Sequence, residues 1–331
     1  MTNVMEKDYE VVHLKPWQPN KPISRGAIAY HEAVANADYY LESLDKLMSI
    51  IAQKIKDGDI VVDYGAGTGV SAMYMLKRLK ANIKLWLVDN SPAWLGKAYD
   101  IFHKNPNVEC FILEKNNEDY ATLCETIGEQ TADHVISANT VHLIPNLEYT
   151  FKGINLALKP NGTFTFQSGN ITRRGRKKGV LMVDDTVKRV HDIAMEIVKE
   201  NKKYKNYREI IKKQIEPNKK QQNFVFPEPR PLEYYLASLK SAYFKYAEPY
   251  YKLLRIAYKD WMEFLRVKRL QAGILPEIGG INPSPQEEKD RDELITMSAN
   301  QLFKELERHN PMSDDKCFTV ELVYVTATKQ H

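Results

Sequence analysis

Short apolar runs that alternate with helix-length segments are the feature of this chain that most constrains its fold. Residues 70–79 and 92–103 separate such runs and carry apolar side chains at helical spacing. Strands that alternate with helices predict a parallel sheet covered by helices on both faces. Five runs in the first half are candidate strands: 60–63, 84–89, 108–113, 133–137 and 162–167.

The alternation stops after residue 170 and returns near the end of the chain. Residues 244–253 and 318–325 read as further strands, and 232–239 as a helix between the insertions. We therefore expect an N-terminal arm and helix start over 1–45, with the arm reaching about residue 28. A sheet domain would follow from 46–170, 231–254 and 317–331. Two mainly helical insertions, 171–230 and 255–316, would form a cap.

Composition restricts the class of protein only broadly. The 331 residues are 43% hydrophobic and 27% charged, as in an ordinary globular protein, and the net charge of +4 is too small to imply nucleic acid by itself. The three cysteines have no CxxC spacing, so we expect neither a disulfide framework nor a metal site, and a reducing cytoplasm. No apolar stretch predicts a signal peptide in residues 1–15 or a transmembrane helix.

The most informative segment is the glycine-rich turn at 63–69, with the sequence Asp-Tyr-Gly-Ala-Gly-Thr-Gly. Glycines allow a tight turn and the close approach of a ligand to the backbone, and amides at a helix start can face a polar ligand. Asp89 ends the next strand, where a carboxylate can accept hydrogen bonds from a ribose diol. Two alternatives are a connection without ligand and a dinucleotide site. The GxGxG spacing, with Asp63 two positions before the first glycine, favours a cationic ligand over a pyrophosphate.

This segment resembles motif I of the class I S-adenosylmethionine (SAM)-dependent methyltransferases. Residues 88–91 are similar to the second motif of that family, and 158–162 (Leu-Lys-Pro-Asn-Gly) to its "LKPGG" turn, with Asn161 in place of a glycine. The resemblance implies a Rossmann-like α/β fold, with a seven-stranded, mostly parallel sheet and an antiparallel last strand. It also implies SAM as the cofactor and S-adenosylhomocysteine (SAH) as its product. It says little about the acceptor, because one scaffold serves many substrates.

The resemblance assigns the cofactor contacts. The glycines would line the methionine and ribose part of SAM, Asp63 would lie near its amino group, and Asp89 would hold the ribose hydroxyls. Asn90 and one of two asparagines after the third strand would lie against the adenine. The full expected set is Asp63, Gly65, Ala66, Gly67, Gly69, Asp89, Asn90, Asn116, Asn117 and Asn139.

The acceptor would bind beyond the carboxyl ends of the strands. There His142 is a candidate general base, with packing as the alternative, since methyl transfer often needs no base. Gln167 and Asn170, at the end of the fifth strand, could orient a substrate or lie in a solvated loop. Arg173 opens the basic run 173–178, which could receive an anion or be a solvated loop.

These observations predict a cytoplasmic transferase that moves a methyl group to a small organic acceptor by in-line SN2 displacement, through an O, N, C or carboxylate atom. We expect no nucleic-acid partner, and the sequence leaves the oligomeric state open. One alternative is an RNA or protein methyltransferase that docks through the basic segment 171–229, which holds 16 Lys and Arg against 8 Asp and Glu. Another is a protein that binds SAM without transferring its methyl group.

Overall fold

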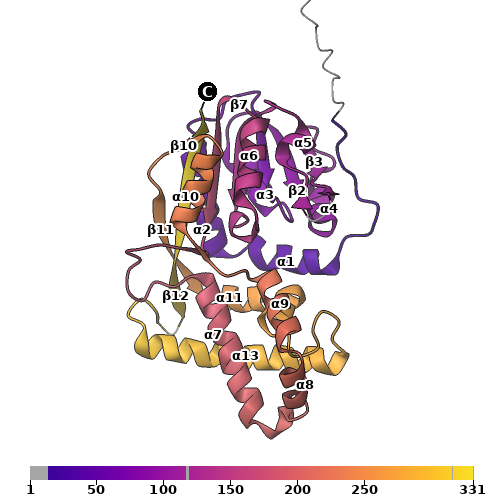
Figure 1. Ribbon diagram of the computed structural model, residues 1–331, viewed down its shortest axis with the longest axis vertical. Helices are drawn as coiled ribbons and strands as arrows, with labels where there is room; N and C mark the ends of the chain where they lie inside the picture. Colours follow the sequence, from indigo (N-terminus) through magenta and orange to yellow (C-terminus); the bar gives the residue numbers. More distant parts are fainter. Residues whose placement is uncertain (1–13, 117–118, 315, 331) are drawn as a thin grey trace, which may run out of the picture.

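A computed structural model describes residues 14–116, 119–314 and 316–330 of the chain. Its main sheet has the order β10-β12-β7-β6-β1-β2-β3, and β11 pairs with another part of β12, on the same edge as β10 (Figure 1). Strands β1, β2, β3, β6 and β7 are mutually parallel where they pair, and β12 is antiparallel to β7. The expected Rossmann-like α/β fold is therefore confirmed. The strands are β1 (Ile60–Tyr64), β2 (Lys84–Asp89), β3 (Val108–Ile112), β6 (Ala132–Ala138), β7 (Leu158–Ser168), β10 (Phe244–Tyr246), β11 (Tyr250–Ala257) and β12 (Cys317–Lys329).

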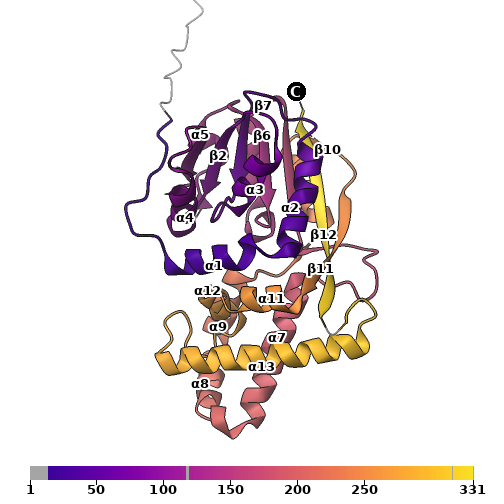
Figure 2. The same cartoon turned by 180° about the vertical axis from the view of Figure 1, so that it is seen from behind.

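Helices cover both faces of this sheet, as its apolar strands require. One face packs against α2 (Asp38–Ile51), α3 (Val70–Arg78) and α4 (Pro92–Phe102), and the other against α5 (Leu123–Ile127), α6 (Leu147–Ala157) and α10 (Leu232–Ser241) (Figures 1 and 2). Buried residues such as Leu47 and Leu95 on the first face, and Phe151 and Tyr235 on the second, form the two cores.

A group of helices beyond one end of the sheet forms what we call the cap. In Figure 1 it lies below the sheet, with α1 (Arg25–Ala35) at the boundary. Helices α7 and α13 pack against each other, and α8 with the far end of α7 lies furthest from the sheet (Figure 2). The cap helices are α7 (Val183–Glu200), α8 (Tyr207–Lys213), α9 (Ile215–Val225), α11 (Tyr258–Leu265), α12 (Lys268–Ile274) and α13 (Pro285–His309). None of the helices in the described ranges is long and apolar enough to cross a membrane.

Two expectations about the outer parts of the chain were wrong in detail. The single strand expected over 244–253 is two strands, β10 and β11, so the main sheet has eight strands rather than seven. Phe244 pairs with Lys329 at the end of β12, whereas Tyr250 pairs with Tyr324. The arm expected to reach residue 28 ends earlier, because α1 begins at Arg25 and buries Ala27 and Val34. Residues 1–13 lie outside the described part.

Asn161 occupies a position where the family's motif has glycine, and its backbone conformation explains why asparagine is tolerated there. Asn161 has φ of 65°, in the left-handed region. Asparagine tolerates this region better than other residues that carry a side chain, apart from aspartate and histidine. The departure from the family's motif therefore leaves the turn intact.

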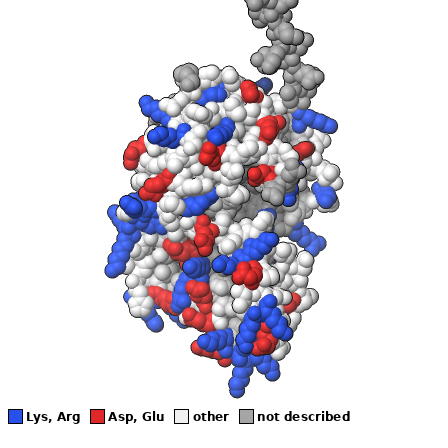
Figure 3. Space-filling view, in the orientation of Figure 1, with Lys and Arg blue, Asp and Glu red and all other residues white. Residues whose placement is uncertain are grey.

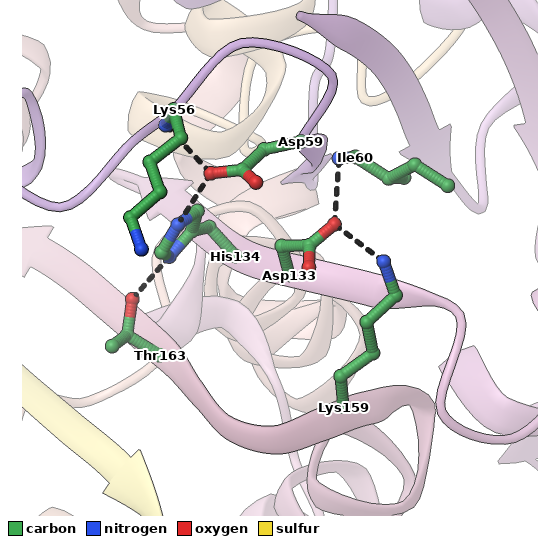
Figure 4. Close-up of polar contacts among 7 residues, drawn as sticks. All are labelled: Lys56, Asp59, Ile60, Asp133, His134, Lys159 and Thr163. Carbon is green, nitrogen blue, oxygen red and sulfur yellow. Dashed lines mark hydrogen bonds and ion pairs between the residues drawn. The ribbon is translucent and has the colours of Figure 1, made fainter.

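Polar side chains join three parallel strands at the end of the sheet that lies away from the cap (Figure 4). His134 on β6 lies 3.2 Å from the carboxylate of Asp59 through Nε2, and 2.8 Å from the hydroxyl of Thr163 on β7 through Nδ1. The neighbouring Asp133 accepts hydrogen bonds from the Ile60 amide and the Lys159 ammonium. These contacts fix the amino ends of β1, β6 and β7 relative to one another. They therefore stabilise the strand register, on which the relative positions of the carboxyl ends depend.

Candidate active site

A partly enclosed cavity of about 960 Å³ lies at the carboxyl ends of the parallel strands, between the sheet domain and the cap. Cavities for single small ligands span about 300–1,000 Å³, so this one is at the large end of that range. Its wall on the sheet side includes the glycine turn and Asp89, and its wall on the cap side includes Trp261 and Leu270. The cavity therefore has room for a cofactor and a second molecule side by side.

The glycine turn after β1 has the backbone shape that the sequence predicts. Gly65 and Gly67 have φ of 74° and 55°, which residues with a side chain rarely adopt. A Cβ at Gly65 would lie 2.2 Å from the side chain of Thr140. Gly67 has no such crowding, because an added Cβ would meet only the Gly65 carbonyl oxygen, at 4.0 Å. The turn thus packs closely on one side and leaves backbone open to the cavity on the other.

Asp89 lines the cavity at the end of β2 and is held by backbone amides. Oδ2 accepts a hydrogen bond of 2.8 Å from the Gly67 amide, and Oδ1 accepts one of 2.8 Å from the Ser91 amide. Burial raises the pKa of this carboxyl group, and the two amides partly offset the shift. A carboxylate oxygen can accept more than one hydrogen bond, so each oxygen keeps a free acceptor site for a hydroxyl group.

Asp63 lies behind the turn and does not line the cavity. It is fully buried, and its Oδ2 accepts a hydrogen bond of 2.5 Å from the Ser71 hydroxyl. Its Oδ1 has no hydrogen-bond partner among the described residues. Burial raises the pKa of Asp63 to about 7, with the hydrogen bond from Ser71 acting in the opposite direction. Such a carboxylate would gain from a cation placed near it.

The other expected cofactor residues fall into two groups. Ala66, Asn90 and Asn139 line the cavity. Gly69 does not, and it lies immediately before the first residue of α3. Asn116 is exposed in the short strand β4 (Lys115–Asn116) and does not line the cavity. Asn117 lies outside the described residues. From the far side of this loop, Asp119 and Tyr120 line the cavity.

The loop after β6 forms part of the cavity wall. Asn139 has φ of 52°, an uncommon backbone conformation for a residue with a side chain, and the Thr140 hydroxyl lies 3.1 Å from the Gly65 carbonyl oxygen. His142 lines the cavity, and burial next to Arg230 lowers its pKa to about 4. The imidazole is therefore neutral at physiological pH.

Arg230, at the end of the first insertion, holds this loop. Its guanidinium group donates to the carbonyl oxygens of Val141, His142 and Ile144 at 3.3, 3.3 and 2.7 Å, and to that of Pro145 at 3.3 Å. The guanidinium also packs against the ring of Tyr235, 5.2 Å from its centre. Arg230 thereby fixes the shape of the wall that carries His142.

The three residues expected to orient the acceptor lie in different places. Asn170 lines the cavity, and its side-chain oxygen accepts from the Asp184 amide. Gln167 is fully buried in β7, away from the cavity lining. Arg173 also lies outside the lining, in a bidentate ion pair with Glu321 at 2.6 and 2.7 Å. Glu321 is only 3% exposed, so a buried carboxylate of the fold itself neutralises the charge of Arg173.

Several cavity residues were missed by sequence reasoning because they come from outside the sheet domain. Helices α1 and α2 contribute Tyr30, Tyr39 and Tyr40, and α12 contributes Arg269. The density of aromatic residues was the available signal, but it also fits ordinary packing. No group of three or more His, Cys, Asp or Glu suited to a metal ion occurs within the described ranges.

A family model described as a methyltransferase domain matches residues 55–228, more than half of the chain. The chain belongs to this methyltransferase family. It is a SAM-dependent methyltransferase of class I, as the resemblance at the glycine turn implied. No curated protein matches it.

The chain is similar to several solved structures at low identity. A candidate sarcosine dimethylglycine methyltransferase from Galdieria sulphuraria is 10% identical, covering 92% of this chain and 99% of that one, with a TM-score of 0.50. Phosphoethanolamine N-methyltransferase 2 from Haemonchus contortus is 16% identical, covering 92% of this chain and 58% of that one, with a TM-score of 0.49. The YcgJ protein from Bacillus subtilis is 13% identical, covering 88% and 99%, with a TM-score of 0.49. Identities this low say nothing about the acceptor.

The residues present fit SAM. The open backbone at Gly67 and the spare acceptor sites of Asp89 suit a ribose, and the buried Oδ1 of Asp63 lacks a partner that an ammonium group could supply. That each of these residues contacts the cofactor remains a prediction.

Proposed function

We propose that this methyltransferase acts on a small organic acceptor that is held between the glycine turn and the cap. The observation that carries the proposal is the partly enclosed cavity of about 960 Å³, whose lining joins Asp89 and the cap residue Trp261. Enclosure of this kind excludes water and orients two reactants. A nucleic-acid or protein chain could place only an extruded base or a single side chain in such a cavity.

SAM supplies a methyl group on a sulfonium, which is a good leaving group, so alignment provides much of the rate. The chain's own residues provide that alignment. The glycine turn and Asp89 would hold the cofactor, and the loop that Arg230 fixes would form the wall beside the acceptor. His142 would meet the acceptor as a neutral imidazole, since its pKa is about 4.

The charge distribution supports a small acceptor over RNA. Of the basic run 173–178, Arg173 is paired with Glu321, and the Arg176 guanidinium lies 3.6 Å from the same carboxylate. On the face shown in Figure 3, Lys and Arg are interspersed with Asp and Glu, although basic side chains gather at the lower end of the cap. A long polyanion binds best to a continuous basic surface.

Methyl transfer should be tested with fractions of one cell extract: small molecules, RNA and protein. We expect SAH to form, and a methylated product to appear by mass spectrometry, with the small-molecule fraction. Methylation confined to the RNA or protein fraction would contradict the proposal. SAH binding without transfer to any fraction would support the alternative of a SAM-binding protein.

RNA binding needs a separate measurement. We expect no salt-sensitive, sub-micromolar binding of RNA near physiological ionic strength. The suitable variant replaces Arg174, Lys177 and Lys178 with Ser, because these residues are outside the Glu321 ion pairs. Tight RNA binding that this variant abolishes would favour the docking alternative.

A further inference from the structure

A cationic side chain of the cap lines the cavity. Arg269, on α12, lines the cavity and lies over the ring of Trp94, with its guanidinium carbon 5.1 Å from the ring centre. No hydrogen bond or ion pair to its side chain occurs among residues 14–116, 119–314 and 316–330. Arg173, by contrast, is matched by a carboxylate. Arg269 thus offers hydrogen-bond donors to whatever the cavity holds.

The nearest acidic group does not satisfy this guanidinium. Asp89 lies close enough to act on Arg269 electrostatically, but its oxygens accept from backbone amides and face the expected ribose site. Tyr30 is the other group near Arg269, and burial raises the pKa of its hydroxyl to about 12, so it carries no charge at neutral pH. Arg269 is nevertheless exposed to solvent, although partial burial of its guanidinium group lowers its pKa. An anion bound beside it would supply the charge partner that the described residues do not provide.

A second hollow, of about 590 Å³, lies next to the first and shares the lining residues Phe224, Val225 and Arg269 with it. Its other charged lining residues are Lys268, Arg291 and Glu288. Lys268 is paired with Glu288, while Arg291 donates to the Gly280 carbonyl oxygen at 2.7 Å. The hollow therefore contains more positive than negative charge.

Apart from Arg269, the residues that α11 and α12 contribute to the cavity lining are apolar or aromatic. Leu270 follows Arg269 on α12, Phe264 and Trp261 come from α11, and Val225 ends α9. A ligand in this part of the cavity would bury hydrocarbon or aromatic surface and would meet one guanidinium at its edge.

Together, these contacts indicate a class of substrate. This inference rests on the proposed function. We propose that the acceptor is a small molecule with an apolar body and an anionic group, and that the anionic group lies against Arg269. Carboxylate, sulfonate and phosphate share the required chemistry, because each can accept paired hydrogen bonds from a guanidinium.

Two fluorescent probes that share one aromatic skeleton test this directly. 8-Anilinonaphthalene-1-sulfonate carries an anion, and N-phenyl-1-naphthylamine lacks it. Both would be titrated into the full chain saturated with SAH, so no turnover is needed. We expect the sulfonate probe to bind at one site, and Arg269→Gln to weaken it at least tenfold while changing the neutral probe less than twofold. Arg269→Lys should restore part of the affinity.

Arg266→Gln is the matched control, because Arg266 is an exposed arginine just after α11 that does not line the cavity. It should leave both probes unchanged. Equal weakening of both probes by Arg269→Gln, no weakening, or no saturable binding of the sulfonate probe would each overturn the proposal. A loss of SAH affinity in Arg269→Gln would also overturn it, by assigning Arg269 to the cofactor. Failure of the proposed function is seen separately, in the methyl-transfer assay.

Discussion

The hydroxyl oxygen of Ser168 lies 3.0 Å from Nδ1 of His142, and it also accepts a hydrogen bond from the Asn170 amide. His142 Nδ1 is the only acceptor for the Ser168 proton among the described residues. When Ser168 donates to Nδ1, the neutral imidazole carries its own proton on Nε2. In that state His142 presents a donor to the cavity rather than a base.

This arrangement predicts how two substitutions at His142 should differ. A glutamine can still donate a hydrogen bond but cannot take a proton. We therefore expect His142→Gln to keep turnover within about tenfold of the wild type, whereas His142→Ala should lose more; general bases contribute about 10²–10⁴-fold. Steady-state kinetics between pH 4 and 8 would measure both. A hundredfold loss in His142→Gln, with an acid limb near pH 4 in the wild type, would instead assign His142 as the general base.

Arg230 should act through the loop that it holds. Arg230→Gln leaves up to four carbonyl oxygens without their donor, at a cost of about 1–3 kcal/mol for a buried unsatisfied group. We expect kcat to fall at least tenfold while the Kd for SAH stays within twofold. Arg208→Gln is the matched control, because Arg208 also donates to backbone carbonyls but lies outside the cavity lining. If the control lowers kcat equally, Arg230 has only a general structural role.

Asp89 is expected to hold the cofactor's ribose. Asp89→Ala should weaken SAM and SAH binding by about 1–3 kcal/mol, the range for losing hydrogen bonds to a charged group. Calorimetric titration of the folded variant measures this directly. Asp100→Ala, at an exposed position on α4, serves as the control. Unchanged affinity in Asp89→Ala would refute the assignment.

Asp63 should make the stability of the cofactor-free protein depend on pH. Its pKa rises from 3.8 in the unfolded chain to about 7 in the fold, so between these values the folded state binds more protons. Its contribution therefore becomes less favourable as the pH rises through that window. The quantity to compare is the free energy of unfolding of Asp63→Asn minus that of the wild type. We expect this difference to be larger at pH 8 than at pH 5 by at least about 1 kcal/mol, since one pKa unit corresponds to about 1.4 kcal/mol.

Urea denaturation at both pH values would test the Asp63 prediction. Asp100→Asn should show no such trend, because Asp100 is exposed. If the stability difference between Asp63→Asn and the wild type does not change with pH, the fold does not raise the pKa of Asp63.

The sequence predicts the parts of the site that depend on local geometry. The positive φ angles of Gly65 and Gly67 follow from a strand–turn–helix pattern, and Asp89 follows from the end of the next strand. The break between β10 and β11 has no comparable signal, because both halves pair with one long strand at different places. Arg269 could not be placed for a different reason. It lies 180 residues from Asp89 along the chain, and only packing of the cap brings the two together.

Strand β12 belongs to both parts of the molecule. Its first half pairs with β11 from Cys317 to Tyr324, beside the cap, and its second half pairs with β7 from Val323 to Thr328, within the sheet domain. Because β12 is hydrogen-bonded in both parts, unfolding of either part would remove hydrogen-bond partners from the other. The cap and the sheet domain should therefore melt in a single cooperative transition, for which the calorimetric and van't Hoff enthalpies agree.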